Sequence, residues 1–280
     1  MLNELKVWLQ YVVPQHGLSR LAGLLMESRI PWLKRFLISV IAKRFHVSLE
    51  EAERTDQEDY ETFNDFFTRA LKPGVRPIGS ATFVSPADGQ ISQIGDIHAG
   101  TLIQAKGKVF TVKSLLGVDA KQAAQFENGK FTTIYLSPKD YHRVHMPIDG
   151  RLTDMIHVPG NLFSVNQSTT EAVDRLFARN ERVVCLFDTP IGPVAVIMVG
   201  AMIVGSIETV WAGQVAPRVV APTRVQYVGE DQCIELKQGE EMGRFKMGST
   251  VILLAPPEFE WRSDLGPEDV VKMGQSLTQN

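Results

Sequence analysis

The sequence predicts an α+β protein in which N-terminal amphipathic helices precede a mainly antiparallel β sandwich or barrel-like core. In residues 1–48 apolar residues recur at helical spacing, whereas beyond residue 80 short Val- and Ile-rich runs alternate with Gly, Pro and Asp turns. The chain has 280 residues, of which 44% are hydrophobic and 22% charged, which is typical of a protein that buries a core. We expect a helical segment with its connector in residues 1–79 and a β-rich domain in residues 80–280.

Three helices are expected in the first 48 residues, over 2–12, 18–26 and 32–45. None has the ~20 apolar residues needed to span a bilayer. Residues 1–48 contain seven basic and two acidic side chains, a net charge of +5, so the rest of the chain holds −8 of the total of −3. Basic amphipathic helices with tryptophans are typical of membrane interfaces, although packing on the protein's own core remains an alternative.

The connector contains two further helix signals. Ser48-Leu49-Glu50-Glu51 has the form of a capping box and predicts a short acidic helix. Another helix is expected from Thr62, with Phe63, Phe66 and Phe67 on one face. Residues 72–79, rich in Pro and Gly, are expected to lead into the main domain near residue 80.

The main domain is expected to consist largely of strands, with helices at 112–127 and 169–178. The expected strands are 82–86, 90–96, 101–105, 131–137, 150–158, 183–188, 193–199, 201–208, 224–229, 233–237 and 250–254. Residues 189–207 carry no charge over nearly the length of a membrane span. Five Pro and Gly residues interrupt this stretch, so it is predicted to form two buried strands that meet near Gly200.

Gly248-Ser249-Thr250, directly before an apolar run, suggests a chemical function. A hydroxyl next to a glycine carbonyl can attack that carbonyl, and holding both groups in one chain lowers the barrier by several kcal/mol. Such an attack cuts the chain between Gly248 and Ser249 through an ester, and elimination then converts Ser249 into an N-terminal pyruvoyl group. Taken alone, the tripeptide is more typical of a turn that leads into a strand.

Other motifs accompany this one. The most specific are Ser85-Pro86-Ala87-Asp88-Gly89, Tyr141-His142-Arg143-Val144-His145-Met146-Pro147 and Gly243-Arg244-Phe245 followed by Met247-Gly248-Ser249-Thr250. With matching stretches at 63–69, 158–166 and 204–208, the sequence resembles the bacterial phosphatidylserine decarboxylases, the pyruvoyl-dependent prokaryotic type I family. The resemblance extends over nearly the whole chain in the family's order. Met247 departs from the family's usual leucine, a substitution of similar volume that costs little.

The resemblance implies roles for four residues. Asp88, His145 and Ser249 match the relay used for self-cleavage, and His142 is expected to supply or relay a proton in the later reaction. From the residues alone, Asp88-Gly89 also indicates a turn, and His145 also fits a buried core histidine. The H-x-x-H spacing invites a metal site, but no further ligand stands at a recognisable spacing, so no metal is predicted. A serine hydrolase that acts on a lipid or ester would use the same three residues and remains the alternative; it would keep Ser249 intact.

The activity implied is decarboxylation of phosphatidylserine to phosphatidylethanolamine and CO2, through a Schiff base with the pyruvoyl group derived from Ser249. This covalent group is the only cofactor expected. Self-cleavage is expected to leave a large subunit, 1–248, and a small subunit, 249–280, that associate as a heterodimer; a higher oligomer stays open. The substrate in the membrane is the expected partner, and no nucleic acid is expected. Because no signal peptide is evident, a peripheral location on the cytoplasmic face of the inner membrane is expected.

Overall fold

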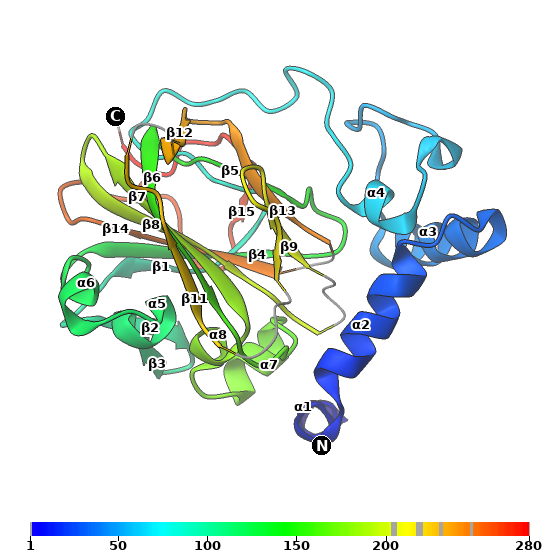
Figure 1. Cartoon of the computed structure of the whole chain (residues 1–280), viewed down its shortest axis with the longest axis horizontal. Coiled ribbons are helices and arrows are strands. Elements are labelled where there is room, and N and C mark those ends of the chain that lie inside the picture. The colour runs from blue at the N-terminus through cyan, green and yellow to red at the C-terminus, as the bar shows by residue number, and fades with distance from the viewer. Residues whose placement is uncertain (1, 203–205, 217–220, 230–231, 247–248, 280) are drawn as a thin grey trace.

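The computed structural model describes residues 2–202, 206–216, 221–229, 232–246 and 249–279. A helical arm lies beside a β-rich body (Figure 1). The arm contains α1 (Leu2–Val12), α2 (Gln15–Met26) and α3 (Pro31–Phe45). Pro31 opens α3, at a position where its missing N–H has no helical partner to lose. None of the described helices is both long enough and apolar enough to cross a membrane.

The connector between arm and body confirms one predicted helix and corrects the other. Helix α4 (Phe63–Phe67) begins at Thr62, whose hydroxyl accepts a hydrogen bond from the Asp65 amide at 3.0 Å. The helix predicted from Ser48 is absent; a turn at 50–51 leads into a bridge between Ala52 and Leu71, followed by the 3-10 turn η1 (Gln57–Asp59). The Lys72 amide donates to the Glu51 carbonyl, so this backbone pairs with a distant segment instead of coiling.

The main sheet lies at the centre of the body, and all its described pairings are antiparallel. Its strands are β1 (Gly89–Asp96), β4 (Lys130–Leu136), β6 (Gly150–Val158), β7 (Arg182–Thr189), β8 (Gly192–Val199), β11 (Thr223–Gln226), β14 (Ser249–Ala255) and β15 (Val270–Val271). They lie in the order β11-β6-β7-β8-β14-β4-β1-β15, and β12 (Glu235–Leu236) also pairs with β6. The predicted α+β class is confirmed, and in the described chain the sheet is open, ending at β11 and β15.

Two layers cover the main sheet. One face packs on a smaller sheet, β10-β9-β13-β5, through apolar side chains that include Val144, Ile207 and Phe245. Its strands are β5 (Arg143–His145), β9 (Ile207–Thr209), β10 (Gly213–Ala216) and β13 (Glu241–Phe245). Short helices cover the other face, beside the hairpin of β2 (Thr101–Ala105) and β3 (Lys108–Thr111) (Figure 1). These helices are α5 (Val112–Leu116), α6 (Ala120–Ala124), α7 (Gln167–Ala172) and α8 (Leu176–Arg179).

Some predicted boundaries in the body were wrong. The helix expected at 112–127 is divided into α5 and α6, because Gly117 ends α5 with a φ of 66°, in the left-handed region. The helix expected at 169–178 forms α7 and α8, and Asn166 caps α7 by accepting from the Thr169 amide at 3.0 Å. Of the expected strand 82–86, only Val84 forms a bridge. Val204, Gly205, Met247 and Gly248 lie outside the described residues.

Candidate active site

Strand register brings Asp88 and Ser249 to the same end of the main sheet. Strand β4 lies between β1 and β14, with Tyr135 opposite both Gln90 and Thr250 and with Leu136 opposite Ser249. Because neighbouring strands lie about 4.8 Å apart, the backbones of Asp88 and Ser249 are roughly 10 Å apart across β4. The structure thus collects these residues from segments far apart in the sequence; the Ser249 side chain lies outside the described part of the chain.

His145 reaches the same end of the sheet, where its amide donates to the Pro86 carbonyl at 2.8 Å. Its Nδ1 lies 2.8 Å from the Gly239 carbonyl, and its Nε2 lies 3.0 Å from the Tyr141 hydroxyl. A carbonyl only accepts, so Nδ1 carries the proton and donates to Gly239, and Nε2 accepts from Tyr141. Burial lowers the pKa of His145, so the ring is neutral near pH 7, with Nε2 as its basic atom.

Asp88 is paired with groups other than His145. Its carboxylate accepts from Arg76 at 2.9 and 2.6 Å, from Lys272 at 3.2 Å and from the Met273 amide at 2.8 Å. Burial alone would raise the pKa of Asp88, but the hydrogen bonds and charge of Arg76, with the Met273 amide, lower it, so the carboxylate is ionised. In a hydrogen-bonded triad, Asp88 would accept the hydrogen bond from Nδ1 of His145. In this structure the Gly239 carbonyl accepts that bond instead. The relay role of Asp88 stays a prediction.

His142 is the other histidine of the motif, and it is completely buried. Its Nδ1 donates to the Asp140 carbonyl at 2.8 Å, and its ring lies 4.0 Å from the Phe67 ring, centroid to centroid. Its Nε2 is buried and has no hydrogen-bond partner. Burial, reinforced by the positive charge of Arg69, lowers the pKa of His142 to about 3. The lone pair of Nε2 is therefore unoccupied, and the His142 backbone carbonyl accepts from the Phe245 amide at 3.0 Å.

This pKa predicts a loss of stability in acid. Between pH 6.5 and about 3, the unfolded chain binds a proton on His142 that the folded chain does not. The free energy of unfolding should therefore fall as the pH falls, by about 1.4 kcal/mol per unit for this proton. His142→Gln should reduce the slope of the unfolding free energy against pH by the amount that one proton contributes. Urea titrations from pH 6.5 to 4.5 measure this slope. A slope equal to that of the parent would contradict the assignment, and exposed His98→Gln is the matched control.

The arm contacts the strand that leads to the predicted cut. Lys246 forms ion pairs with Glu27 at the end of α2, at 3.0 Å, and with Glu208 of β9, at 2.7 Å. The amide group of Asn64 donates to the same Glu27 carboxylate at 3.0 Å. A cavity of about 350 Å³ opens there, lined by α2 side chains together with Ser206, Gln214 and Lys246. Sequence reasoning did not assign these residues to a site, although Asn64, Ser206 and Glu208 lie in family-matching stretches.

Basic residues near the site differ in their partners. Arg143 and Arg244 both pair with Glu241, at 2.9 and 2.7 Å. The two guanidinium groups therefore share one carboxylate. Lys139 forms no ion pair within the described ranges. Together with Tyr141 and Asp88 it lines a separate cavity.

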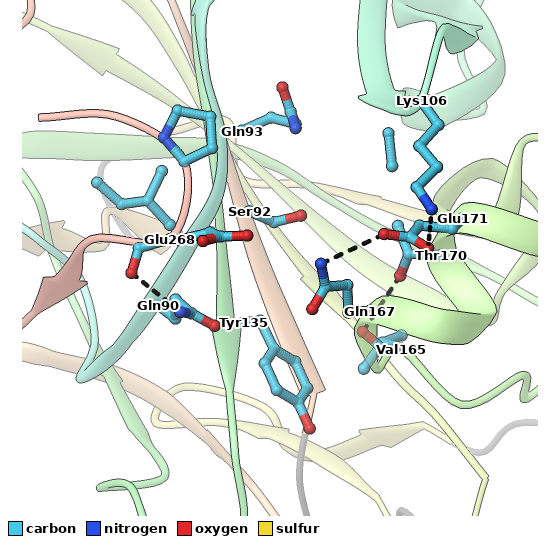
Figure 2. A pocket seen from close by; sticks show the side chains of 13 residues that line it. Gln90, Ser92, Gln93, Lys106, Tyr135, Val165, Gln167, Thr170, Glu171 and Glu268 are labelled. Carbon is cyan, nitrogen blue, oxygen red and sulfur yellow. Dashed lines mark hydrogen bonds and ion pairs between the residues drawn. The ribbon is translucent and has the colours of Figure 1, made fainter.

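A further cavity, of about 230 Å³, lies against the face of the main sheet that the helices cover (Figure 2). Its charged groups are satisfied locally, because Lys106 pairs with Glu171 at 2.7 Å and Gln167 donates to the same carboxylate. Tyr135, directly opposite Thr250, forms part of its lining. Asp88, His142, His145 and Ser249 are not among the residues that line this cavity. Among the residues described, no group of three His, Cys, Asp or Glu is placed to hold a metal ion.

Comparison with known proteins gives a consistent result along the chain. A family model described as phosphatidylserine decarboxylase matches residues 63–279, and a second model, described as PSD, matches residues 5–46. The phosphatidylserine decarboxylase proenzyme of Ectopseudomonas mendocina is 53% identical over 99% of this chain and 98% of its own length. The proenzyme of Stutzerimonas stutzeri is 53% identical over 100% and 95%, respectively. That of Bordetella avium is 54% identical over 96% and 92%.

Proposed function

This chain belongs to the phosphatidylserine decarboxylase family, and we propose that it decarboxylates phosphatidylserine with a pyruvoyl group made from its own Ser249. The observation that supports this most strongly is the position of Ser249. It begins a central strand at the end of the sheet where the neutral His145 and His142 also lie. The relatives are named proenzymes, a word that implies processing of a precursor.

In the maturation that we propose, the Tyr141 hydroxyl first releases Nε2 of His145, and Nε2 then accepts the proton of the Ser249 hydroxyl. The hydroxyl oxygen bonds to the Gly248 carbonyl carbon, and the bond from that carbon to the Ser249 nitrogen breaks as His145 returns the proton to that nitrogen, which leaves an ester and a free amine. Loss of the Ser249 α-proton then expels the Gly248 carboxylate and leaves a dehydroalanine. Its imine tautomer reacts with water and releases ammonia, so the chain from residue 249 begins with a pyruvoyl group. Proton acceptance by a positioned histidine contributes typically 10²–10⁴-fold to such a step.

The site fits a pyruvoyl group chemically. When formed, this group supplies a carbonyl that takes up the electron pair left behind as CO2 departs. The residue that this chain contributes to proton transfer in turnover is His142. Its ring is fully buried against Phe67, Nδ1 donates to a backbone carbonyl, and Nε2 has no hydrogen-bond partner. In this proposal His142 relays the proton that reaches the carbon that has lost its carboxyl group.

The arm's surface supports contact with a membrane. Its inner side packs on the body and on the aromatic cluster of Tyr60, Phe63, Phe66 and Phe67. One side of the arm therefore packs on the protein's own core. Its outer side exposes many large apolar side chains. These are Trp8, Leu9, Val12, Leu18, Leu21, Leu25, Ile30, Trp32, Phe36 and Val40. Basic helices that expose tryptophans suit the interface of an anionic bilayer, so we propose peripheral attachment to the cytoplasmic face of the inner membrane.

Polar substitutions on the outer side of the arm should weaken membrane binding. Trp32 and Phe36 are 69% and 60% exposed in α3, so Trp32→Ser with Phe36→Ser should leave the fold intact. Losing two interfacial aromatic anchors should reduce partitioning into phosphatidylglycerol-containing vesicles about tenfold or more. Co-sedimentation measures this. Val109→Ser with Val270→Ser, two exposed positions in the body, should leave partitioning unchanged, and equal partitioning of both double variants would contradict the assignment.

Intact-mass measurement of active protein tests the proposed maturation. Two chains, with a pyruvoyl-blocked chain beginning at residue 249, support the decarboxylase mechanism and a heterodimer of both pieces. A single chain with an unmodified Ser249 and esterase activity supports the serine hydrolase alternative instead. Measuring phosphatidylethanolamine and CO2 on the same sample links processing to turnover.

A further inference from the structure

The cavity that Lys139 lines beside Tyr141 and Asp88 is rich in basic side chains. It has a volume of about 230 Å³ and lies between the connector and the histidine motif. Its basic lining residues are Arg69, Arg76, Lys139 and Lys272. Lys272 comes from the segment that follows the proposed cut, and the others precede it. The cavity is therefore formed jointly by the two proposed subunits.

The acidic residues of the cavity neutralise only some of this charge. Asp88 and Glu51 both pair with Arg76, at 2.6 Å each, and Lys272 shares Asp88. Asp140 accepts from the Ser137 amide at 2.8 Å, and burial raises the pKa of its carboxyl group. Within the described chain, Arg69 and Lys139 have no carboxylate partner at ion-pair distance. His46, at the end of α3, completes the polar lining.

Arg69 is the unusual member, because it is only 4% exposed and forms no ion pair in the described chain. Its Nη2 donates to the Lys139 carbonyl at 2.9 Å, which fixes the guanidinium beside the cavity. Its Nη1 is buried and has no hydrogen-bond partner. Burying an unpaired charged donor is costly, so folded proteins usually provide such a group with an acceptor. An anion bound in the cavity that Arg69 lines would pair with this guanidinium charge.

We propose that this cavity binds a phosphate-type oxyanion, held by Arg69 with Lys139 and Lys272. A guanidinium matches the spacing of phosphate oxygens, and an exposed lysine adds a flexible point charge at the mouth. Tyr141 also lines the cavity, and its hydroxyl contacts Nε2 of His145, so the bound anion lies one side chain from the proposed base. The phosphate belongs to the lipid headgroup or is free phosphate. Only the first assignment rests on the proposed decarboxylation.

Calorimetric titration of inorganic phosphate into the full-length purified enzyme tests the site without turnover. The parent should bind, and Lys139→Gln should weaken binding roughly tenfold, as expected for loss of one charged hydrogen bond. Arg69→Gln should weaken it at least as much, provided that its thermal unfolding matches the parent. Exposed Lys121→Gln, on α6, is the matched control and should bind like the parent.

Kinetics with phosphatidylserine vesicles then identify the source of the phosphate. A raised KM in the Lys139 variant, with competitive inhibition of the parent by inorganic phosphate, assigns the site to the lipid headgroup. Phosphate binding that leaves KM and inhibition unaffected assigns it to free phosphate. Absence of phosphate binding, or binding that Lys139→Gln and a folded Arg69→Gln leave unchanged, overturns the proposal. Failure of the decarboxylation itself would leave the calorimetric result standing.

Discussion

Replacing Ser249 by alanine should leave one uncut chain of 280 residues with no measurable decarboxylation. The Ser249 side chain supplies both the attacking oxygen and the carbon atoms of the pyruvoyl group, so its loss removes maturation and turnover together. The expected loss of activity is at least roughly 10⁴-fold, the scale seen when a covalent nucleophile is removed. Intact mass under denaturing conditions and CO2 release measure the two effects separately.

The control for this variant is Ser92→Ala, in strand β1 of the same sheet. It should mature like the parent, because Ser92 lines the cavity of Figure 2, away from the histidines. Cleavage of Ser249→Ala at the 248–249 bond would show that another residue is the nucleophile.

Changing the two histidines of the motif should stop two different steps. His145→Gln should accumulate uncut chain, with maturation slowed roughly 10²–10⁴-fold, because it removes the basic Nε2 and its orienting bond to Gly239. His142→Gln should still yield two chains, yet turnover should fall by a similar factor, because Nε2 is the unpaired proton carrier. The time course of cleavage on denaturing gels, followed by single-turnover CO2 release from the cut fraction, separates the two defects.

Exposed His98→Gln is the control for both histidine variants and should affect neither step. The assignment fails if His145→Gln matures at the parent rate. It fails equally if cut His142→Gln decarboxylates at the parent rate. A full exchange of the two phenotypes would reverse the assigned roles.

Local signals in the sequence predicted many of the elements. Pro31 and Thr62 lie at real helix starts because their effects on backbone geometry and capping are local. The capping box at Ser48 failed because the Lys72 amide and Leu71 draw that backbone into pairing across the connector. Gly117 divided a helix because it adopts a left-handed conformation, which a periodicity of apolar residues does not reveal.

The site could be predicted only as a list of residues. The motifs indicated Asp88, His142, His145 and Ser249, and strand register places their backbones at one end of the sheet. Their partners could not be read from spacing. The carbonyl that orients His145 belongs to Gly239, 94 residues away, and Lys272 reaches Asp88 over 184 residues. Such contacts arise from packing, so only a structure reveals which group neutralises or orients another.

The position of β14 has a consequence for refolding of the protein after cleavage. The strand lies between β8 and β4, and β15 of the same segment pairs with β1, so residues 249–279 are woven into the sheet on both sides. Once the proposed cut is made, denatured pieces would have to find each other by diffusion, and renaturation becomes a second-order process. The precursor has to acquire its shape first, while its parts are still covalently joined. The mature, cut protein should therefore refold poorly after thermal denaturation.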